Sequence, residues 1–194
     1  MPRIALPGRA ELSPEQQRVH DGVVSGPRGT IIGPLRAAIH NPELAEKWSA
    51  LGEVLRFRTA LPKRLNELAI ITTARRFGSQ IEWWVHARAA AEAGLPPGVI
   101  EAIRHAEPPA FDDAADAEIY AFTRALHHEG EVPLPLYNAV LARWGARGVV
   151  DLTALIGYYT MVSYTLNNHE IPLPEGVAPP LTGQGLTTLP EAAA

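Results

Sequence analysis

The chain has 194 residues, of which 46% are hydrophobic and 20% are charged, a composition typical of one ordinary globular domain. Its formal net charge is −4 and its 17 lysines and arginines are scattered, so we expect no nucleic-acid partner. It contains no cysteine, which excludes disulfides, thiolate metal ligands and thiol nucleophiles.

The N-terminal segment, residues 1–16, has no apolar run of the length that a secretory signal needs, and we therefore expect a cytoplasmic protein. The most apolar stretch, residues 148–166, is interrupted by Asp151 and by several threonines and serines. It falls short of the roughly 18 apolar residues of a membrane span, so we expect no membrane association. A helix this apolar should be buried in the core or against another subunit.

Helix signals dominate the chain and strand signals are nearly absent. Ser13 and Gln16 form a predicted capping box, Ser79 is expected to cap a later helix, and Asp112 or Asp113 another. The pattern predicts an all-α bundle of about seven or eight helices. The longer helical segments are 14–24, 42–59, 63–77, 79–93, 113–129, 133–144 and 146–167, with shorter ones at 34–40 and 95–105.

Three regions are expected along the chain. Residues 1–12 should form an extended N-terminal arm, and residues 13–172 should form the helical domain. Residues 173–194 are rich in proline, glycine and threonine and should be extended or disordered. No repeat with a period of 20 to 50 residues is visible, so a solenoid is not indicated.

Glu82 and His86 are four residues apart, which places a carboxylate beside an imidazole on one helix face, and Ser79 shares that face. Glu67 lies on the preceding predicted helix, and Gly78 separates the two helices. The helices can therefore form a hairpin whose inner faces meet, which would bring both carboxylates and the histidine into one crevice.

Such a group suits proton transfer, because a carboxylate can orient a histidine and raise its pKa. Two alternatives remain open: a solvated Glu82–His86 pair without function, and a divalent metal held by Glu67, Glu82 and His86, although no familiar metal spacing supports it. Trp83 and its neighbour point about 100° apart, so at most one of them can line the crevice.

The segment LNELAIITTARRFGSQIEWWVHARAAAEAGLPPGVIEAI resembles the central motif of the carboxymuconolactone decarboxylase family, which includes the alkyl hydroperoxidase D-like proteins. The segment GVVDLTALIGYYTMVSYTLNN, followed by IPLPEG, is similar to the closing helix of that family. The resemblance spans residues 34–176. It implies an alkyl hydroperoxidase D-like bundle that assembles as a homo-oligomer, a trimer or a hexamer.

The peroxidase branch of the family uses a glutamate, a Cys-x-x-Cys pair and a histidine. The resemblance matches the glutamate to Glu67 and the histidine to His86, whereas Ser79 and Glu82 stand where the cysteines would be. Cysteine-based peroxide reduction is therefore closed to this chain. The decarboxylase branch needs no cofactor, and we expect none here, nor a metal.

The resemblance thus implies decarboxylation or isomerisation of a small carboxylated lactone or a related intermediate of aromatic catabolism. We expect His86 to transfer the proton, with Glu82 and Glu67 orienting it and tuning its pKa. Substrate contacts are expected from Ser79, Trp83, Arg75 and Arg76, the two arginines holding an anionic substrate. The alternative is a non-catalytic small-molecule-binding or scaffold oligomer with the same fold.

Overall fold

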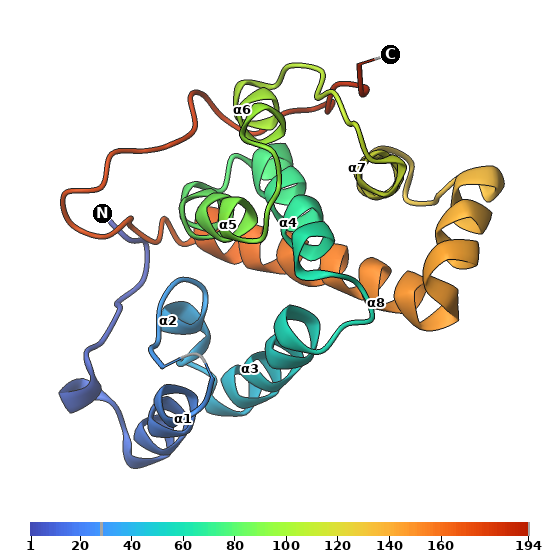
Figure 1. Cartoon of the computed structure of the whole chain (residues 1–194). Helices are drawn as coiled ribbons and strands as arrows, with labels where there is room; N and C mark the ends of the chain where they lie inside the picture. The colour runs from blue at the N-terminus through green and yellow to red at the C-terminus, as the bar shows by residue number, and fades with distance from the viewer. Residues whose placement is uncertain (28, 194) are drawn as a thin grey trace.

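Helix α4, Lys63–Phe77, lies at the centre of the structure. The structure is a computed structural model, and it describes residues 1–27 and 29–193. Helices α5, α7 and α8 pack around α4 (Figure 1). Every residue from Leu65 to Arg75 is buried, although the sequence pattern indicated only a wide apolar stripe. The hydroxyls of Thr72 and Thr73 donate to carbonyls one turn back, both at 2.8 Å, so the polar side chains of this helix are accommodated in the core.

The described residues form eight α-helices and one short 3-10 helix, and contain no strand. The predicted all-α class is confirmed, and the predicted helix limits agree with the structure to within a few residues. The elements are η1 (Arg9–Glu11), α1 (Pro14–Ser25), α2 (Leu35–Ala38), α3 (Pro42–Phe57), α4 (Lys63–Phe77), α5 (Gln80–Glu92), α6 (Pro97–His105), α7 (Ala114–Glu129) and α8 (Leu134–Asn168).

Short polar side chains start several of these helices, as the sequence predicts. Ser13 and Gln16 form the expected capping box at α1, and Asp113 accepts a hydrogen bond from the Ala115 amide at 2.8 Å to cap α7. Ser79 is different: it precedes α5, but its side chain makes no capping hydrogen bond. Ser79 therefore occupies the predicted N-cap position of α5, but it does not cap the helix through its side chain.

Helix α8 consists of two halves that meet at Gly145, whose φ of 68° and ψ of 178° are not helical. The halves correspond to the two helices predicted on either side of that residue. The second half buries one face in the core and exposes the opposite face. Its exposed stripe consists of Val150, Ala154, Gly157, Met161 and Tyr164.

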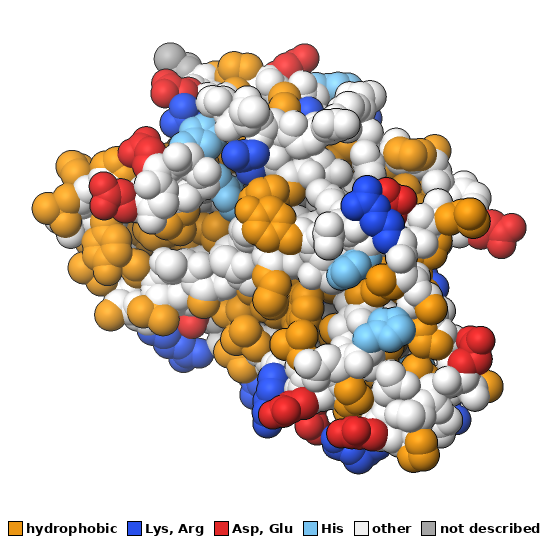
Figure 2. Space-filling view, turned by 180° about the vertical axis from the view of Figure 1, so that it is seen from behind, with side chains coloured by type: hydrophobic (Ala, Val, Ile, Leu, Met, Phe, Trp, Pro, Cys, Tyr) orange, Lys and Arg blue, Asp and Glu red, His pale blue; other side chains and the backbone are white. Residues whose placement is uncertain are grey.

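Figure 2 shows the molecule from the side opposite to that of Figure 1. On this side hydrophobic side chains form a broad band, and charged side chains lie mostly toward the edges. Despite the apolar character of α8, none of the helices in residues 1–27 and 29–193 combines the length and the hydropathy that a bilayer crossing requires.

The C-terminal tail, residues 173–193, contains no helix or strand, and it packs along α4, α5 and α7. Ala194 of the predicted tail lies outside the described residues. Leu181 and Leu189 are 3% and 1% exposed, and the Leu186 amide donates to the carbonyl of Arg76 at 2.8 Å. The tail is thus an extended strap that covers part of the helical core.

The tail crosses the α4–α5 turn at two glycines. Gly78 has a φ of 61°, and a Cβ there would lie 2.6 Å from the amide nitrogen of Gly185. A Cβ on Gly185 would in turn lie 2.8 Å from the carbonyl oxygen of Arg76. Only glycine at both positions allows the two backbones to approach this closely.

We predict that Gly78→Ala destabilises the fold more than Gly94→Ala does. Both glycines have positive φ, which costs alanine about 1–2 kcal/mol, but a Cβ on Gly94 meets nothing within 4 Å. The clash with the tail should add about 1–3 kcal/mol to the cost at Gly78. Urea unfolding of the two variants measures the difference, and equal losses would show that the tail does not pack on this turn.

Candidate active site

The turn between α4 and α5 sets the geometry of the site. Gly78 adopts the left-handed conformation that ends α4, and the Ser79 amide donates to the carbonyl of Ala74 at 2.8 Å. α5 therefore folds back along α4 at once. As a result, Glu67 in the second turn of α4 lies opposite His86 in the second turn of α5.

His86 lies between two carboxylates in the interior. Its Nδ1 is 2.7 Å from Glu67 Oε2, a hydrogen bond, and its Nε2 is 3.2 Å from Glu82 Oε2. The second contact is within ion-pair distance but lacks the geometry of a hydrogen bond. The side chains of His86, Glu67 and Glu82 are only 3%, 2% and 8% exposed. The three residues that the sequence grouped therefore form one buried cluster. The alternative of a solvated Glu82–His86 pair is wrong.

The two carboxylates determine the charge of His86. Burial by itself lowers the pKa of the imidazole, but the hydrogen bond to Glu67, the contact with Glu82 and the charges of both outweigh burial. Together they raise the pKa of His86 from 6.5 to about 9. At neutral pH the histidine is an imidazolium, and it can serve as a proton donor inside the protein.

Two tyrosines of α8 complete the surroundings of the histidine. The ring of Tyr159 meets that of His86 edge-on, with 5.0 Å between the centroids, and Tyr158 meets Tyr159 at 5.3 Å. Burial raises the pKa of Tyr159 well above its ordinary value of 10, and the charge of Glu82 adds to this effect. Tyr159 therefore remains a neutral phenol near the cluster.

A cavity of about 40 Å³ lies against Glu82 and His86. Glu67 does not line this cavity, so the accessible side of the imidazole is the side of Nε2. The walls of this cavity come from α5 and α8 and from the segment Ile32–Gly33–Pro34 that precedes α2. In this form the cavity has room for about one water molecule, whose share of liquid volume is roughly 30 Å³.

Arg56, on α3, supplies the guanidinium that lines this cavity. It is not among the site residues predicted from the sequence. Its guanidinium carbon lies 5.4 Å from the ring centroid of the neighbouring Phe57. Arg56 lies near the end of α3, which precedes the α4–α5 hairpin in the chain. Nothing in its sequence spacing relates it to Glu82 or His86. Only the packing of α3 against α8 brings it to the site.

Arg75 and Arg76 do not line the cavity, so the substrate contacts expected of them are wrong. Arg75 donates to the carbonyl of Gln184 at 3.3 Å, and Arg76 donates to the carbonyl of Leu186. Both side chains are on the part of α4 that the C-terminal tail covers. Proximity in sequence to the hairpin turn was misleading, because successive helical residues point in different directions.

Trp83 and Ser79 also lie away from the cavity. Trp83 is 2% exposed and belongs to the hydrophobic core, so it does not line the cavity as expected. Ser79 is fully buried, and its hydroxyl has no hydrogen-bond partner. Neither residue can contact a substrate in this arrangement of the chain.

The metal alternative does not fit the geometry of the cluster. Both ring nitrogens of His86 face carboxylate oxygens, so neither is turned toward a shared metal position. In residues 1–27 and 29–193 no group of three His, Asp or Glu side chains is arranged to hold a metal ion.

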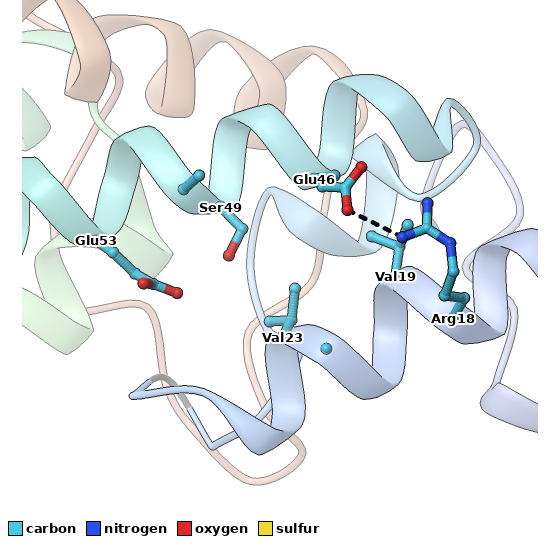
Figure 3. A pocket seen from close by; sticks show the side chains of 8 residues that line it. Arg18, Val19, Val23, Glu46, Ser49 and Glu53 are labelled. Carbon is cyan, nitrogen blue, oxygen red and sulfur yellow. Dashed lines mark hydrogen bonds and ion pairs between the residues drawn. The ribbon is translucent and has the colours of Figure 1, made fainter.

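Another hollow, of about 240 Å³, lies between α1 and α3 (Figure 3). Its cation, Arg18, is already paired with Glu46 at 2.9 Å, and Ser49 and Glu53 lie along the α3 side. The hollow contains no histidine and no buried carboxylate. The buried cluster around His86 is the better candidate for chemistry.

Residues 42–125 match the model of the carboxymuconolactone decarboxylase family, and the matched segment includes Glu67, Glu82 and His86. The fold agrees over most of the chain with solved structures of alkyl hydroperoxidase D-like, peroxidase-related proteins. The likeness to the carboxymuconolactone decarboxylase family thus covers the central segment of the chain, and the likeness to the solved structures covers its fold. No curated protein matches it in sequence.

Three solved structures illustrate the likeness in fold. A peroxidase-related protein from a Silicibacter species has a TM-score of 0.69 at 16% identity, with 90% of this chain and 92% of that chain covered. A peroxidase-related protein from Ralstonia eutropha, described as an alkylhydroperoxidase AhpD core, has a TM-score of 0.70 at 14% identity, with 90% and 93% covered. A cysteine-to-alanine variant of the debrominase Bmp8, in complex with 2,3,4-tribromopyrrole, has a TM-score of 0.68 at 13% identity, with 90% and 95% covered.

We predict that the stability of this protein falls as the pH rises from 6.5 through about 9. The pKa of His86 is higher in the folded state than the ordinary 6.5, so its contribution is fully present below pH 6.5 and is lost as the pH passes about 9. The loss should be at most about 3 kcal/mol. Urea unfolding across this range measures it.

The surface pair Glu101–His105, with Nε2 and Oε2 3.6 Å apart, supplies a matched control for this measurement. His105→Gln should keep the pH dependence of the wild-type protein, and His86→Gln should remove most of it. A wild-type stability that is flat between pH 6.5 and 9 would show that His86 does not hold a proton in the folded state.

Proposed function

We propose that this protein is an enzyme that carries out cofactor-free acid/base chemistry, decarboxylation or isomerisation, on a small carboxylated lactone or a related intermediate of aromatic catabolism. The observation that carries the proposal is the buried imidazolium of His86 between Glu67 and Glu82. Burying three ionisable side chains costs several kcal/mol, and strongly shifted pKa values cluster at functional sites.

The charge of His86 defines its role in the proposed reaction as the general acid. In a decarboxylation, the bond between the carboxylate carbon and the ring breaks, its electron pair moves into the conjugated lactone, and CO₂ leaves. Nε2 of His86 then delivers its proton to a ring carbon. The neutral histidine regains a proton from solvent, and the two carboxylates favour that step because they stabilise the imidazolium.

Arg56 takes the role that the sequence predicted for Arg75 and Arg76. Two carboxylates repel an anionic substrate, and the guanidinium of Arg56 at the cavity wall offsets that repulsion. A cavity of about 40 Å³ is too small for a lactone, so the proposal requires the segment Ile32–Gly33–Pro34 to move outward when substrate binds. This segment passes close to Glu82, because a Cβ on Gly33, whose φ is 57°, would lie 4.0 Å from the Glu82 carboxylate.

A non-catalytic scaffold with the same fold is the alternative. A scaffold gives no physical reason to bury His86 against Glu67, whereas an acid/base site does. The observed 2.7 Å contact in the interior therefore favours the enzyme over the scaffold.

We predict that His86→Gln lowers turnover by about 100-fold or more, the usual contribution of one general acid. Glu82→Gln should keep the acid but lower the pKa of His86, because it removes a neighbouring negative charge. The decline of activity at high pH, centred near pH 9 in the wild type, should then move to lower pH.

Screening the pure protein against carboxylated lactones, with CO₂ release and proton exchange as readouts, identifies the substrate for these measurements. Glu101→Gln and His105→Gln, on the surface pair, serve as controls and should leave both turnover and pH profile unchanged. Full activity in both His86→Gln and Glu82→Gln would place the chemistry elsewhere.

We also propose that the chain forms a homo-oligomer, a trimer or a hexamer, through the outer face of α8. The exposed residues Val150, Ala154, Gly157, Met161 and Tyr164 follow one another at alternating spacings of four and three. This alternation is the spacing at which one helix packs along another, and the small residues in its middle allow close approach.

Light scattering at micromolar concentration should therefore give a mass several times the 21.0 kDa of one chain. We predict that Gly157→Glu, which adds a charge in the middle of the stripe, shifts the protein to a smaller species. Gly98→Glu makes the same change on α6, where a Cβ meets nothing within 4 Å, and should leave the mass unchanged. A wild-type mass of 21.0 kDa would contradict the assembly.

A further inference from the structure

A second cavity, of about 270 Å³, lies on the Glu67 side of the buried cluster. It is formed by the end of α3, the connecting segment and the start of α4, whereas the cavity beside Glu82 is formed by α5, α8 and the segment before α2. Glu67 lines only the second cavity, and Glu82 and His86 line only the first. The cluster thus separates two cavities, and Arg56 lines both of them.

The second cavity carries two cations that no carboxylate neutralises. Arg56 and Lys63 both line it, and neither has a carboxylate within ion-pair distance in the described part of the chain. The cluster of Glu67, Glu82 and His86 keeps one negative charge in excess, and the two cations outnumber that charge by one. The cavity therefore has a net positive character, which favours an anion.

The start of α4 adds to this positive character. Lys63 is the first residue of this 15-residue helix, and the preceding Pro62 offers no side chain to cap it. The amides of Leu65 and Asn66 donate to the carbonyl of Pro62 at 3.0 and 3.2 Å, and the positive end of the helix dipole lies at the cavity.

The rest of the lining is partly apolar and partly a fixed polar pair. Phe57 and Leu61 supply apolar surface, and the amide of Asn66 donates to the Thr59 hydroxyl at 2.6 Å. Asn66 is 4% exposed, and its Oδ1 has no hydrogen-bond partner. An apolar wall beside two cations matches a ligand that has a carboxylate at one end and an apolar body at the other.

We infer that this second cavity is a binding site for small carboxylates with an apolar body, seated with the carboxylate between Arg56 and Lys63. The site is separate from the cavity at which the proposed chemistry takes place, and the inference does not depend on that chemistry. Because Arg56 lines both cavities, a ligand here also alters the charge balance beside Glu82.

Benzoate and its neutral analogue benzamide test the inference directly, because they differ in charge and hardly in shape. The full chain is titrated with each ligand, and binding is measured by calorimetry and by protein NMR. The dissociation constant of benzoate should be at least tenfold lower than that of benzamide. Nuclear Overhauser contacts from the benzoate ring should reach Phe57 and Leu61 rather than Val85 and Val162 of the first cavity.

The two lysines of the chain provide a matched pair of variants. Lys63→Ala should weaken benzoate binding by about fivefold, the effect expected of one exposed cation, and Lys47→Ala, on the outer surface of α3, should not change it. Lys63 is exposed, so its replacement leaves the fold intact.

Equal affinity for benzoate and benzamide, or no effect of Lys63→Ala, would overturn the inference. Contacts of benzoate to Val85 and Val162 alone would also overturn it, because they would place the anion in the first cavity. None of these readouts requires turnover, so a failure of the proposed reaction leaves this test unaffected.

Discussion

The imidazolium of His86 between Glu67 and Glu82 is the interaction on which the site depends. Removing three ionisable side chains from water costs several kcal/mol for each ion, and only close contacts of opposite charge offset that cost. Here the offset comes from contacts of 2.7 and 3.2 Å. The arrangement leaves one negative charge in excess, and that excess explains both the high pKa of the histidine and the need for a cation nearby.

The rest of the fold holds these three side chains in place. α4 is buried along its whole middle, so Glu67 has no route to solvent except the cavity beside it. The turn at Gly78 aligns α5 with α4, and the C-terminal tail covers the other side of this turn. Arg75 and Arg76 donate to carbonyls of the tail, which removes them from the site and joins the tail to α4.

This chain shares the fold of peroxidase-related proteins but contains no thiol. The sequence resemblance matches Glu67 and His86 to the glutamate and histidine of the peroxidase branch, and Ser79 and Glu82 to its two cysteines. A carboxylate in place of a thiol exchanges a redox atom for an acid/base group. The hydroxyl at the other position is buried without a partner, so the two replacements do not contribute equally to the cluster.

The sequence by itself determined the helices, the all-α class and the group Glu67, Glu82 and His86. These features follow from local rules: apolar spacing, capping residues, and the i, i+4 geometry of one helix next to a glycine turn. Only the tertiary structure decided that the cluster is buried, that Arg56 rather than Arg75 or Arg76 faces it, and that Trp83 belongs to the core. Those features depend on how α3, α8 and the tail pack against the hairpin, and such contacts join residues far apart in the chain, where spacing carries no information.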